Sequence, residues 1–111
     1  MKRVVHIGLV GFGTVGKGVY DLISKNRDII ADRTGITLNI KIVCEKMTDL
    51  VKKAAPELSV TDNWKDLIAD KEIETVVELI GGIEPARSIM LAALEAKKNV
   101  VTANKKLLAE A

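Results

Sequence analysis

Three glycines near the start of the chain have the spacing of a phosphate-binding loop, G-x-G-x-x-G. Gly11 permits a tight turn, Gly13 leaves room for a diphosphate beside the main chain, and Gly16 allows a helix to pack closely on a strand. The free N–H groups and the dipole at the start of that helix attract an anion. We therefore predict that a dinucleotide binds through its pyrophosphate to Gly11, Phe12, Gly13, Thr14, Val15 and Gly16.

The motif lies between a predicted strand and a predicted helix, as this mode of binding requires. Residues 4–10 form a nearly continuous apolar run of strand length, and from Thr14 the apolar spacing becomes that of a helix. One face of that helix carries Val15, Val19, Leu22 and Ile23. A polar stretch over 24–28 follows, and Gly35 breaks the pattern. A purely structural strand–turn–helix is the alternative, and the context of the motif argues against it.

A charged pair follows the second predicted strand, Ile36–Cys44, which is rich in β-branched residues. Dinucleotide folds usually place an acidic residue at this strand end, about 20 residues after the glycines, to bind the adenosine ribose. Glu45 comes later than that, and a polar insert over 27–35 accounts for the delay. Glu45 favours NAD and Lys46 favours the 2′-phosphate of NADP, while a solvated charge pair is a third interpretation. The sequence does not choose among them.

The remaining pattern alternates strands and helices. We expect a short helix over 50–55, a very short strand over 58–60, and a helix capped by Asn63 that carries Trp64, Leu67 and Ile68. A strand over 75–80 precedes a helix that begins at Pro85 and whose apolar stripe is Ala86, Ile89, Met90, Ala93 and Leu94. A last strand covers 99–102, and 104–111 opens another helix. This alternation predicts an α/β, Rossmann-like, doubly wound parallel sheet with strand order 3-2-1-4-5, truncated after the fifth strand.

Composition sets limits on the class of protein. The 111 residues allow one domain over 1–111, and a net charge of +2 gives no support for binding to nucleic acid or to an anionic membrane. No apolar run reaches the length needed to span a bilayer. Cys44 is the single cysteine and His6 the single histidine, so we expect no internal disulfide and no metal site. We expect a cytoplasmic protein.

Three segments together resemble homoserine dehydrogenase: residues 8–16, residues 77–82 and residues 100–105, which read GLVGFGTVG, VELIGG and VVTANK. Their order and spacing agree with that family over essentially the whole chain. The resemblance implies a nicotinamide-dependent oxidoreductase that interconverts aspartate 4-semialdehyde and homoserine, with NAD or NADP as cofactor. That reaction serves threonine, methionine and isoleucine biosynthesis.

The resemblance also implies the residues at the nicotinamide side of the site, at the carboxyl ends of the fourth and fifth strands. They are Gly81, Gly82, Thr102, Ala103 and Lys105. Lys105 is implied to be catalytic, because an ammonium group stabilises the negative charge that hydride delivery leaves on the aldehyde oxygen. An ordinary loop is the alternative for the glycine pair, and without the resemblance Lys105 reads as a solvated lysine. We take the adjacent Lys106 as solvent-facing.

The family's substrate-binding and dimerisation domain is absent from these residues. We therefore expect this chain to bind cofactor without turning over substrate, and the full-length enzyme to be a homo-oligomer that acts on a small molecule. Another amino-acid dehydrogenase and a non-catalytic dinucleotide-sensing module are the alternatives. We expect Cys44 to be a buried thiol and His6 a packed residue, and we assign no role to Glu78, which interrupts an apolar strand.

Overall fold

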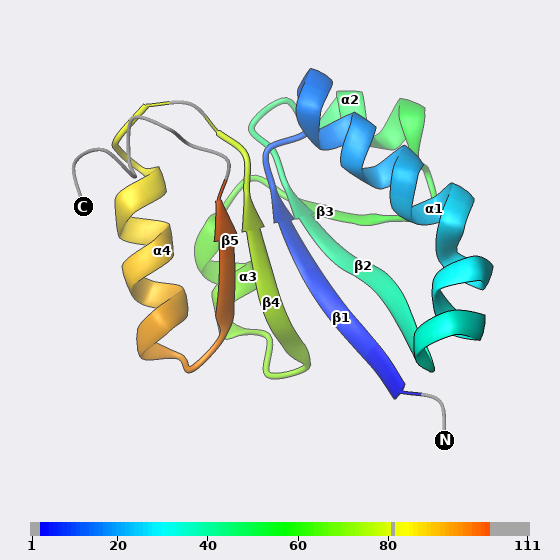
Figure 1. Ribbon diagram of the computed structural model, residues 1–111. Coiled ribbons are helices and arrows are strands. Elements are labelled where there is room, and N and C mark those ends of the chain that lie inside the picture. Colours follow the sequence, from blue (N-terminus) through cyan, green and yellow to red (C-terminus); the bar gives the residue numbers. More distant parts are fainter. Residues whose placement is uncertain (1–2, 81, 103–111) are drawn as a thin grey trace.

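The computed structural model describes residues 3–80 and 82–102 of the chain. Within them, five parallel strands form one sheet of order β3-β2-β1-β4-β5, so the first strand is central (Figure 1). The strands are β1 Arg3–Val10, β2 Ile36–Cys44, β3 Ser59–Thr61, β4 Ile73–Glu78 and β5 Asn99–Thr102. The helices are α1 Thr14–Thr34, α2 Thr48–Ala54, α3 Trp64–Ala69 and α4 Ala86–Glu95. This arrangement confirms the predicted doubly wound sheet and its strand order, and the predicted helix over 104–111 lies outside the described residues.

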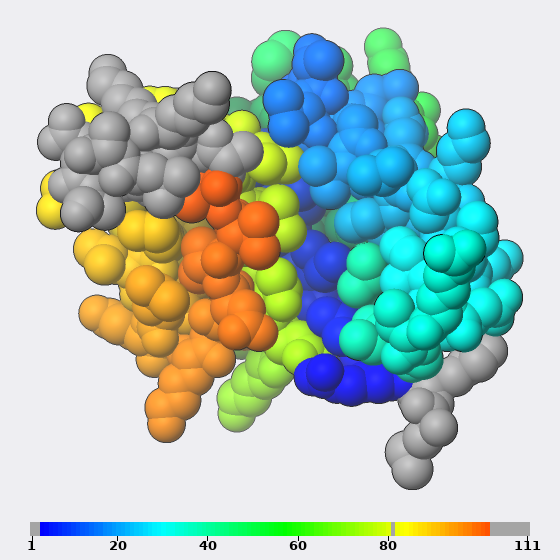
Figure 2. Space-filling view, viewed as in Figure 1, coloured from blue at the N-terminus to red at the C-terminus, as the bar shows by residue number. Residues whose placement is uncertain are grey.

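Helices cover both faces of the sheet and build two apolar clusters (Figure 1). Helices α1 and α2 cover one face, where the buried residues are Leu9, Phe12, Ile40, Val43, Val51 and Ala55. Helices α3 and α4 cover the other face, where they are Val10, Cys44, Leu67, Ile73, Val76, Ile89 and Ala93. Figure 2 shows side chains of β1 and β4 visible between α1 and β5. Burial on both faces explains why the strands read as nearly continuous apolar runs.

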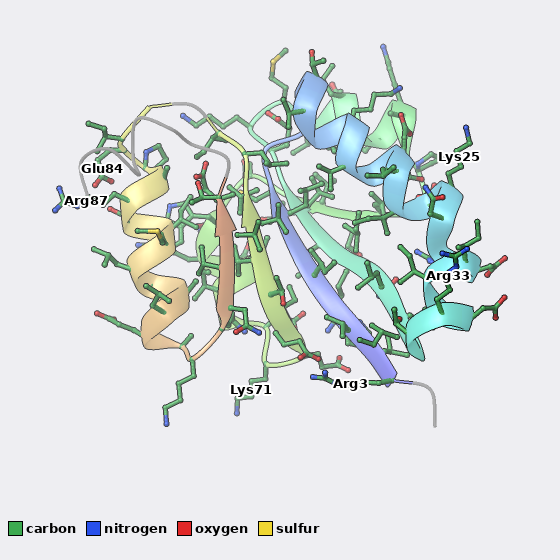
Figure 3. All side chains as sticks on the ribbon, in the orientation of Figure 1. Arg3, Lys25, Arg33, Lys71, Glu84 and Arg87 are labelled. Carbon is green, nitrogen blue, oxygen red and sulfur yellow. The ribbon has the colours of Figure 1, made fainter. Side chains whose placement is uncertain are left out.

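Helix α1 is longer than the sequence pattern predicted. It continues through the polar stretch to Thr34 and ends at Gly35, whose φ of 75° is left-handed and whose N–H donates to the carbonyl of Ala31. The polar residues do not interrupt the helix because its outer face is solvated, where Lys25 and Arg33 point away from the sheet (Figure 3). The predicted polar insert over 27–35 is therefore mostly the end of one helix.

The packing face of α1 also differs from the prediction. Val15 and Leu22 are 58% and 64% exposed, whereas the residues turned to the sheet are Gly16, Val19, Tyr20, Ile23 and Ala31. Successive helical residues are about 100° apart, so the close approach of Gly16 to the loop rotates Val15 to the flank. A glycine counts for little in an apolar pattern, which is why the periodicity assigned Val19 and Ile23 correctly to the packing face but wrongly added Val15 and Leu22.

The other element boundaries differ by one or two residues. Strand β4 begins and ends two residues before the predicted 75–80, because its pairing with β1 ends where Val10 faces Glu78. Pro85 is the residue before α4 and not its first, and Leu94 of the predicted stripe is 53% exposed. The predicted cap is confirmed: the Asn63 side chain accepts a hydrogen bond of 3.0 Å from the N–H of Lys65. These elements bring every loop after a strand to one edge of the sheet.

Candidate functional site

The glycine loop joins β1 to α1 at the carboxyl edge of the sheet. Gly11 has a φ of 100°, which favours glycine, and its N–H donates to the Cys44 carbonyl at 2.9 Å. A Cβ at Gly16 would lie 2.2 Å from the Gly11 carbonyl oxygen. The start of the helix can therefore close on the loop only because both residues are glycine.

Gly13 differs from the other two glycines because space lies beside it. It is exposed, it precedes the first helical residue, and a Cβ built there would meet no protein atom within 4 Å. Thr14 and Val15 are exposed too, and the first turn of α1 holds no acidic side chain. The first N–H groups of a helix have no acceptor within it, so this end of α1 offers donors and a partial positive charge to an anion.

Phe12 contributes to the loop in another way. Its side chain is buried, with the ring centroid 6.0 Å from that of Tyr20. Its N–H donates to the Glu45 carboxylate at 2.9 Å and is therefore engaged within the protein. The part of the loop that is open to solvent is the exposed stretch from Gly13 to Val15.

Glu45 and Lys46 lie at the end of β2, beside this loop. One carboxylate oxygen of Glu45 accepts the Phe12 N–H, and the other accepts the Met47 N–H at 3.0 Å. The main-chain N–H of Glu45 donates to Thr61 at the end of β3. Lys46 is exposed and takes part in no ion pair among the described residues. The two charged neighbours therefore differ in their contacts. Two main-chain N–H groups hold the Glu45 carboxylate, whereas no ion pair among the described residues holds the Lys46 ammonium group.

A cavity of about 280 Å³ opens between the glycine loop, the end of β2 and the starts of α3 and α4. Its lining residues are Val10, Gly11, Cys44, Glu45, Lys46, Asp62, Trp64, Ile80, Pro85 and Ile89. The sequence pattern placed Trp64 on a helix without a role in the site, and it did not identify Asp62. Their position in the sequence could have identified them, because both residues follow β3 at the edge of the sheet where the loops after the strands meet. A larger cavity of about 440 Å³ lies between α1, β2 and the start of β3, and none of the glycine-loop residues lines it.

Glu78 lies fully buried at the end of β4, next to Thr102 at the end of β5. The Thr102 hydroxyl donates to Oε1 of Glu78 at 2.7 Å, and Oε2 of Glu78 has no hydrogen-bond partner among the described residues. The sequence left Glu78 without a role. In the structure Glu78 bonds to Thr102, one of the predicted site residues. This contact joins the carboxyl end of β4 to that of β5.

The predicted site residues divide into two groups. The glycine loop, Glu45 and Lys46 meet at one part of the carboxyl edge, while Gly82 follows β4 and Thr102 ends β5 at the same edge. Gly82 is exposed with a φ of 86°. Three predicted residues, Gly81, Ala103 and Lys105, lie outside the described part of the chain.

Cys44 lines the cavity and yet its thiol is buried. Burial, reinforced by nearby Glu45, Asp62 and Asp66, raises the pKa of the Cys44 thiol to about 11. The thiolate is the reactive form, so Cys44 is a packing residue with little nucleophilic character at neutral pH.

We expect a thiol reagent such as 5,5′-dithiobis(2-nitrobenzoate) to react with the folded chain at pH 8 at least about a hundredfold more slowly than with the urea-unfolded chain. About one thiol in a thousand is ionised three pH units below its pKa, in addition to the limited access. The rate in the folded chain should rise with pH up to about 11, because only the thiolate attacks. Cys44 is the single cysteine, so the colour change reports this residue alone. A rate that levels off below pH 9 would contradict the assignment.

His6 lies against the neighbouring strand β2. Its Nδ1 lies 3.0 Å from the amide nitrogen of Asn39 on the neighbouring strand. Among residues 3–80 and 82–102, no three His, Cys, Asp or Glu side chains gather where they could hold a metal ion. In the same part of the chain, no helix combines the length and the apolar character needed to cross a membrane.

Comparisons with known proteins agree with this geometry. A family model described as the NAD binding domain of homoserine dehydrogenase matches residues 11–111. The homoserine dehydrogenases of Corynebacterium glutamicum and Methylobacillus glycogenes are 44% and 41% identical over 108 residues, covering 95% and 96% of this chain. A crystal structure of a homoserine dehydrogenase from Thiobacillus denitrificans superposes with a TM-score of 0.91 at 39% identity, over 98% of this chain and 26% of that one.

These matches cover nearly all of this chain but only about a quarter of each relative. This chain spans only 24% and 26% of the lengths of the Corynebacterium and Methylobacillus proteins. The part that matches contains the glycine loop, the cavity beside it and the ends of β4 and β5. The chain therefore belongs to the homoserine dehydrogenase family, and it corresponds to the NAD-binding domain of these enzymes.

Proposed function

We propose that the glycine loop holds the pyrophosphate of NAD or NADP over the start of α1. The observation that carries this proposal is the open space at Gly13, at the start of a helix that has neither a side-chain cap nor an acidic first turn. Glu45, Lys46 and Trp64, which line the neighbouring cavity, would hold the adenosine. Gly81, Gly82, Thr102, Ala103 and Lys105 would hold the nicotinamide.

We further propose that the chain serves the interconversion of homoserine and aspartate 4-semialdehyde. A nicotinamide held by these residues would supply or accept the hydride. Lys105 then stabilises the negative charge on the substrate oxygen and supports proton transfer to it. Glu78 and Thr102, joined at the ends of β4 and β5, hold the strand that leads to Lys105.

The remaining parts of the function belong to a longer protein. Because the relatives are about four times as long as this chain, we propose that a substrate-binding and dimerisation domain acts together with residues 1–111. We propose a cytoplasmic homo-oligomer that acts on a small molecule and binds neither nucleic acid nor membranes, which the net charge of +2 supports.

Calorimetric titration of the chain with NAD⁺, NADH, NADP⁺ and NADPH tests the cofactor site. Binding of at least one of them is expected, with no oxidation of homoserine by the chain alone. A titration without heat for all four dinucleotides would contradict the proposal.

Lys105→Ala tests the catalytic assignment, in a chimera where this chain replaces the matching segment of the Corynebacterium glutamicum enzyme. The expected loss of kcat is about a hundredfold to ten-thousandfold, the range for a general acid or an oxyanion donor. Lys106→Ala makes the same change one residue later and is expected to retain nearly all activity. Equal activity of the two variants would remove Lys105 from the mechanism.

A further inference from the structure

The larger cavity, of about 440 Å³, lies where the sheet is incompletely covered at its β3 edge. Strand β3 has three residues and pairs with β2 over Ile42–Cys44. Among the described residues, those of β2 before Ile42 have no strand on this side, and residues 39–41 line the cavity. Helix α1 lines it with Tyr20, Ser24 and Arg27, whose spacing of four and three residues puts them on one face of the helix. The hollow therefore results from a short strand beside a long helix.

Two side chains of opposite charge line this cavity without pairing with each other. Arg27 is exposed and forms no ion pair with any described residue. Glu57, on the segment that leads into β3, accepts a hydrogen bond from the Tyr20 hydroxyl. This hydrogen bond holds the pKa of the Glu57 carboxyl below its usual value, so the group is ionised at neutral pH. The cavity thus offers an unpaired guanidinium group and a separate carboxylate.

Lys41 is a second cation in the lining, but its charge is already balanced. Its ammonium group lies 2.8 Å from a carboxylate oxygen of Asp70 and 2.7 Å from one of Glu72. Ser24 and Ser59 add hydroxyl groups, which can donate or accept hydrogen bonds. Among the described residues that line the cavity, one positive and one negative charge are therefore left for a ligand.

From these charges we propose that the cavity is a second ligand site, which binds a small free α-amino acid as its zwitterion. The ligand carboxylate pairs with the Arg27 guanidinium, and the ligand ammonium group donates to the remaining acceptor positions of Glu57. A ligand with a single charge is attracted by one of these side chains and repelled by the other, whereas a zwitterion is attracted by both. The glycine-loop residues do not line this cavity, so the inference does not rest on the proposed dinucleotide site.

Three compounds that share a side chain and differ in charge test this inference. L-serine is a zwitterion, N-acetyl-L-serine keeps only the carboxylate, and L-serinamide keeps only the ammonium group at about pH 6. Each is titrated into the ¹⁵N-labelled chain and followed by ¹H–¹⁵N spectra. We expect L-serine to shift the amide signals of Ser24, Arg27 and Ser59. It should bind at least about threefold more tightly than either derivative, the effect of one solvent-screened charge contact.

Two variants should change the order of preference in opposite ways. Arg27→Gln removes the positive charge and should make L-serinamide bind as tightly as L-serine. Glu57→Gln removes the negative charge, keeps an oxygen for the Tyr20 hydroxyl, and should make N-acetyl-L-serine bind as tightly as L-serine. Arg33→Gln is the matched control, because Arg33 lies on the same helix, points away from the sheet and does not line the cavity (Figure 3). It should leave all three affinities unchanged.

The outcomes that contradict this inference differ from those that contradict the proposed function. Absence of signal shifts with L-serine would overturn it, and so would equal binding of the three compounds by the unmodified chain. An order of preference that stays the same in Arg27→Gln and Glu57→Gln would also overturn it, because a loss of folding alone weakens all three compounds together. A chain that binds L-serine in this way and no dinucleotide would support this inference and reject the proposed function.

Discussion

Substitution of Gly13 by alanine is expected to lower the affinity for a nicotinamide dinucleotide by at least about tenfold, and valine by more, with almost no loss of folding stability. A Cβ at this position meets no protein atom within 4 Å, so the folded chain accommodates it. The same Cβ occupies the space proposed for the pyrophosphate, and a tenfold loss corresponds to about 1.4 kcal/mol. Calorimetric titration gives the affinity, and urea denaturation gives the free energy of unfolding.

Gly18→Ala is the matched control for Gly13→Ala. Gly18 also has open space around it, and it lies inside α1 one turn beyond the loop. Its replacement should raise the free energy of unfolding by up to about 1 kcal/mol, because alanine favours the helix over glycine, and should leave cofactor affinity unchanged. Undiminished affinity in Gly13→Ala and Gly13→Val would exclude the glycine loop from the binding site.

Gly16→Ala, three residues after Gly13, is expected to lower the free energy of unfolding by about 3 kcal/mol. Its Cβ would lie 2.2 Å from the Gly11 carbonyl oxygen and 2.9 Å from the Gly11 carbonyl carbon, so main chain must move. Overpacking of this kind costs about 1–3 kcal/mol and sometimes more, which exceeds the gain from replacing a helical glycine. For a domain of about 100 residues, such a loss lowers the melting temperature by about 15 °C.

Thermal and urea denaturation of Gly13→Ala, Gly16→Ala and Gly18→Ala together give a decisive pattern. The chemical change is the same in all three, and only the surroundings of the added methyl group differ. We expect stability to fall in Gly16→Ala alone and affinity to fall in Gly13→Ala and Gly16→Ala. A Gly16→Ala chain as stable as the Gly18→Ala chain would show that helix and loop can separate at no cost.

The order of the strands could be predicted from the sequence because few topologies satisfy its constraints. Alternating strands and helices require parallel pairing, and right-handed crossovers then allow few arrangements. The glycine motif fixed β1 as the strand that carries the loop. Local chemistry was sufficient for the Asn63 cap, since the capping side chain and the Lys65 N–H that donates to it are close in sequence.

What the sequence could not supply depends on contacts between distant residues. The rotation of α1, which exposes Val15 and Leu22, follows from the approach of Gly16 to Gly11. The ambiguity between Glu45 and Lys46 arose because both are charged and adjacent, whereas the difference between them lies in the Phe12 amide 33 residues away. The pairing of Glu78 with Thr102 likewise appears only when β4 and β5 are side by side.

Trp64 lies on the wall of the cavity beside Glu45 and is the single tryptophan of the chain. Indole emission from this protein therefore originates at one known location, without a background from other tryptophans. Its spectrum overlaps the absorption of a dihydropyridine ring, so a reduced cofactor bound nearby should quench it and fluoresce in its place. The chain thus carries its own optical reporter of occupancy, which needs no added label.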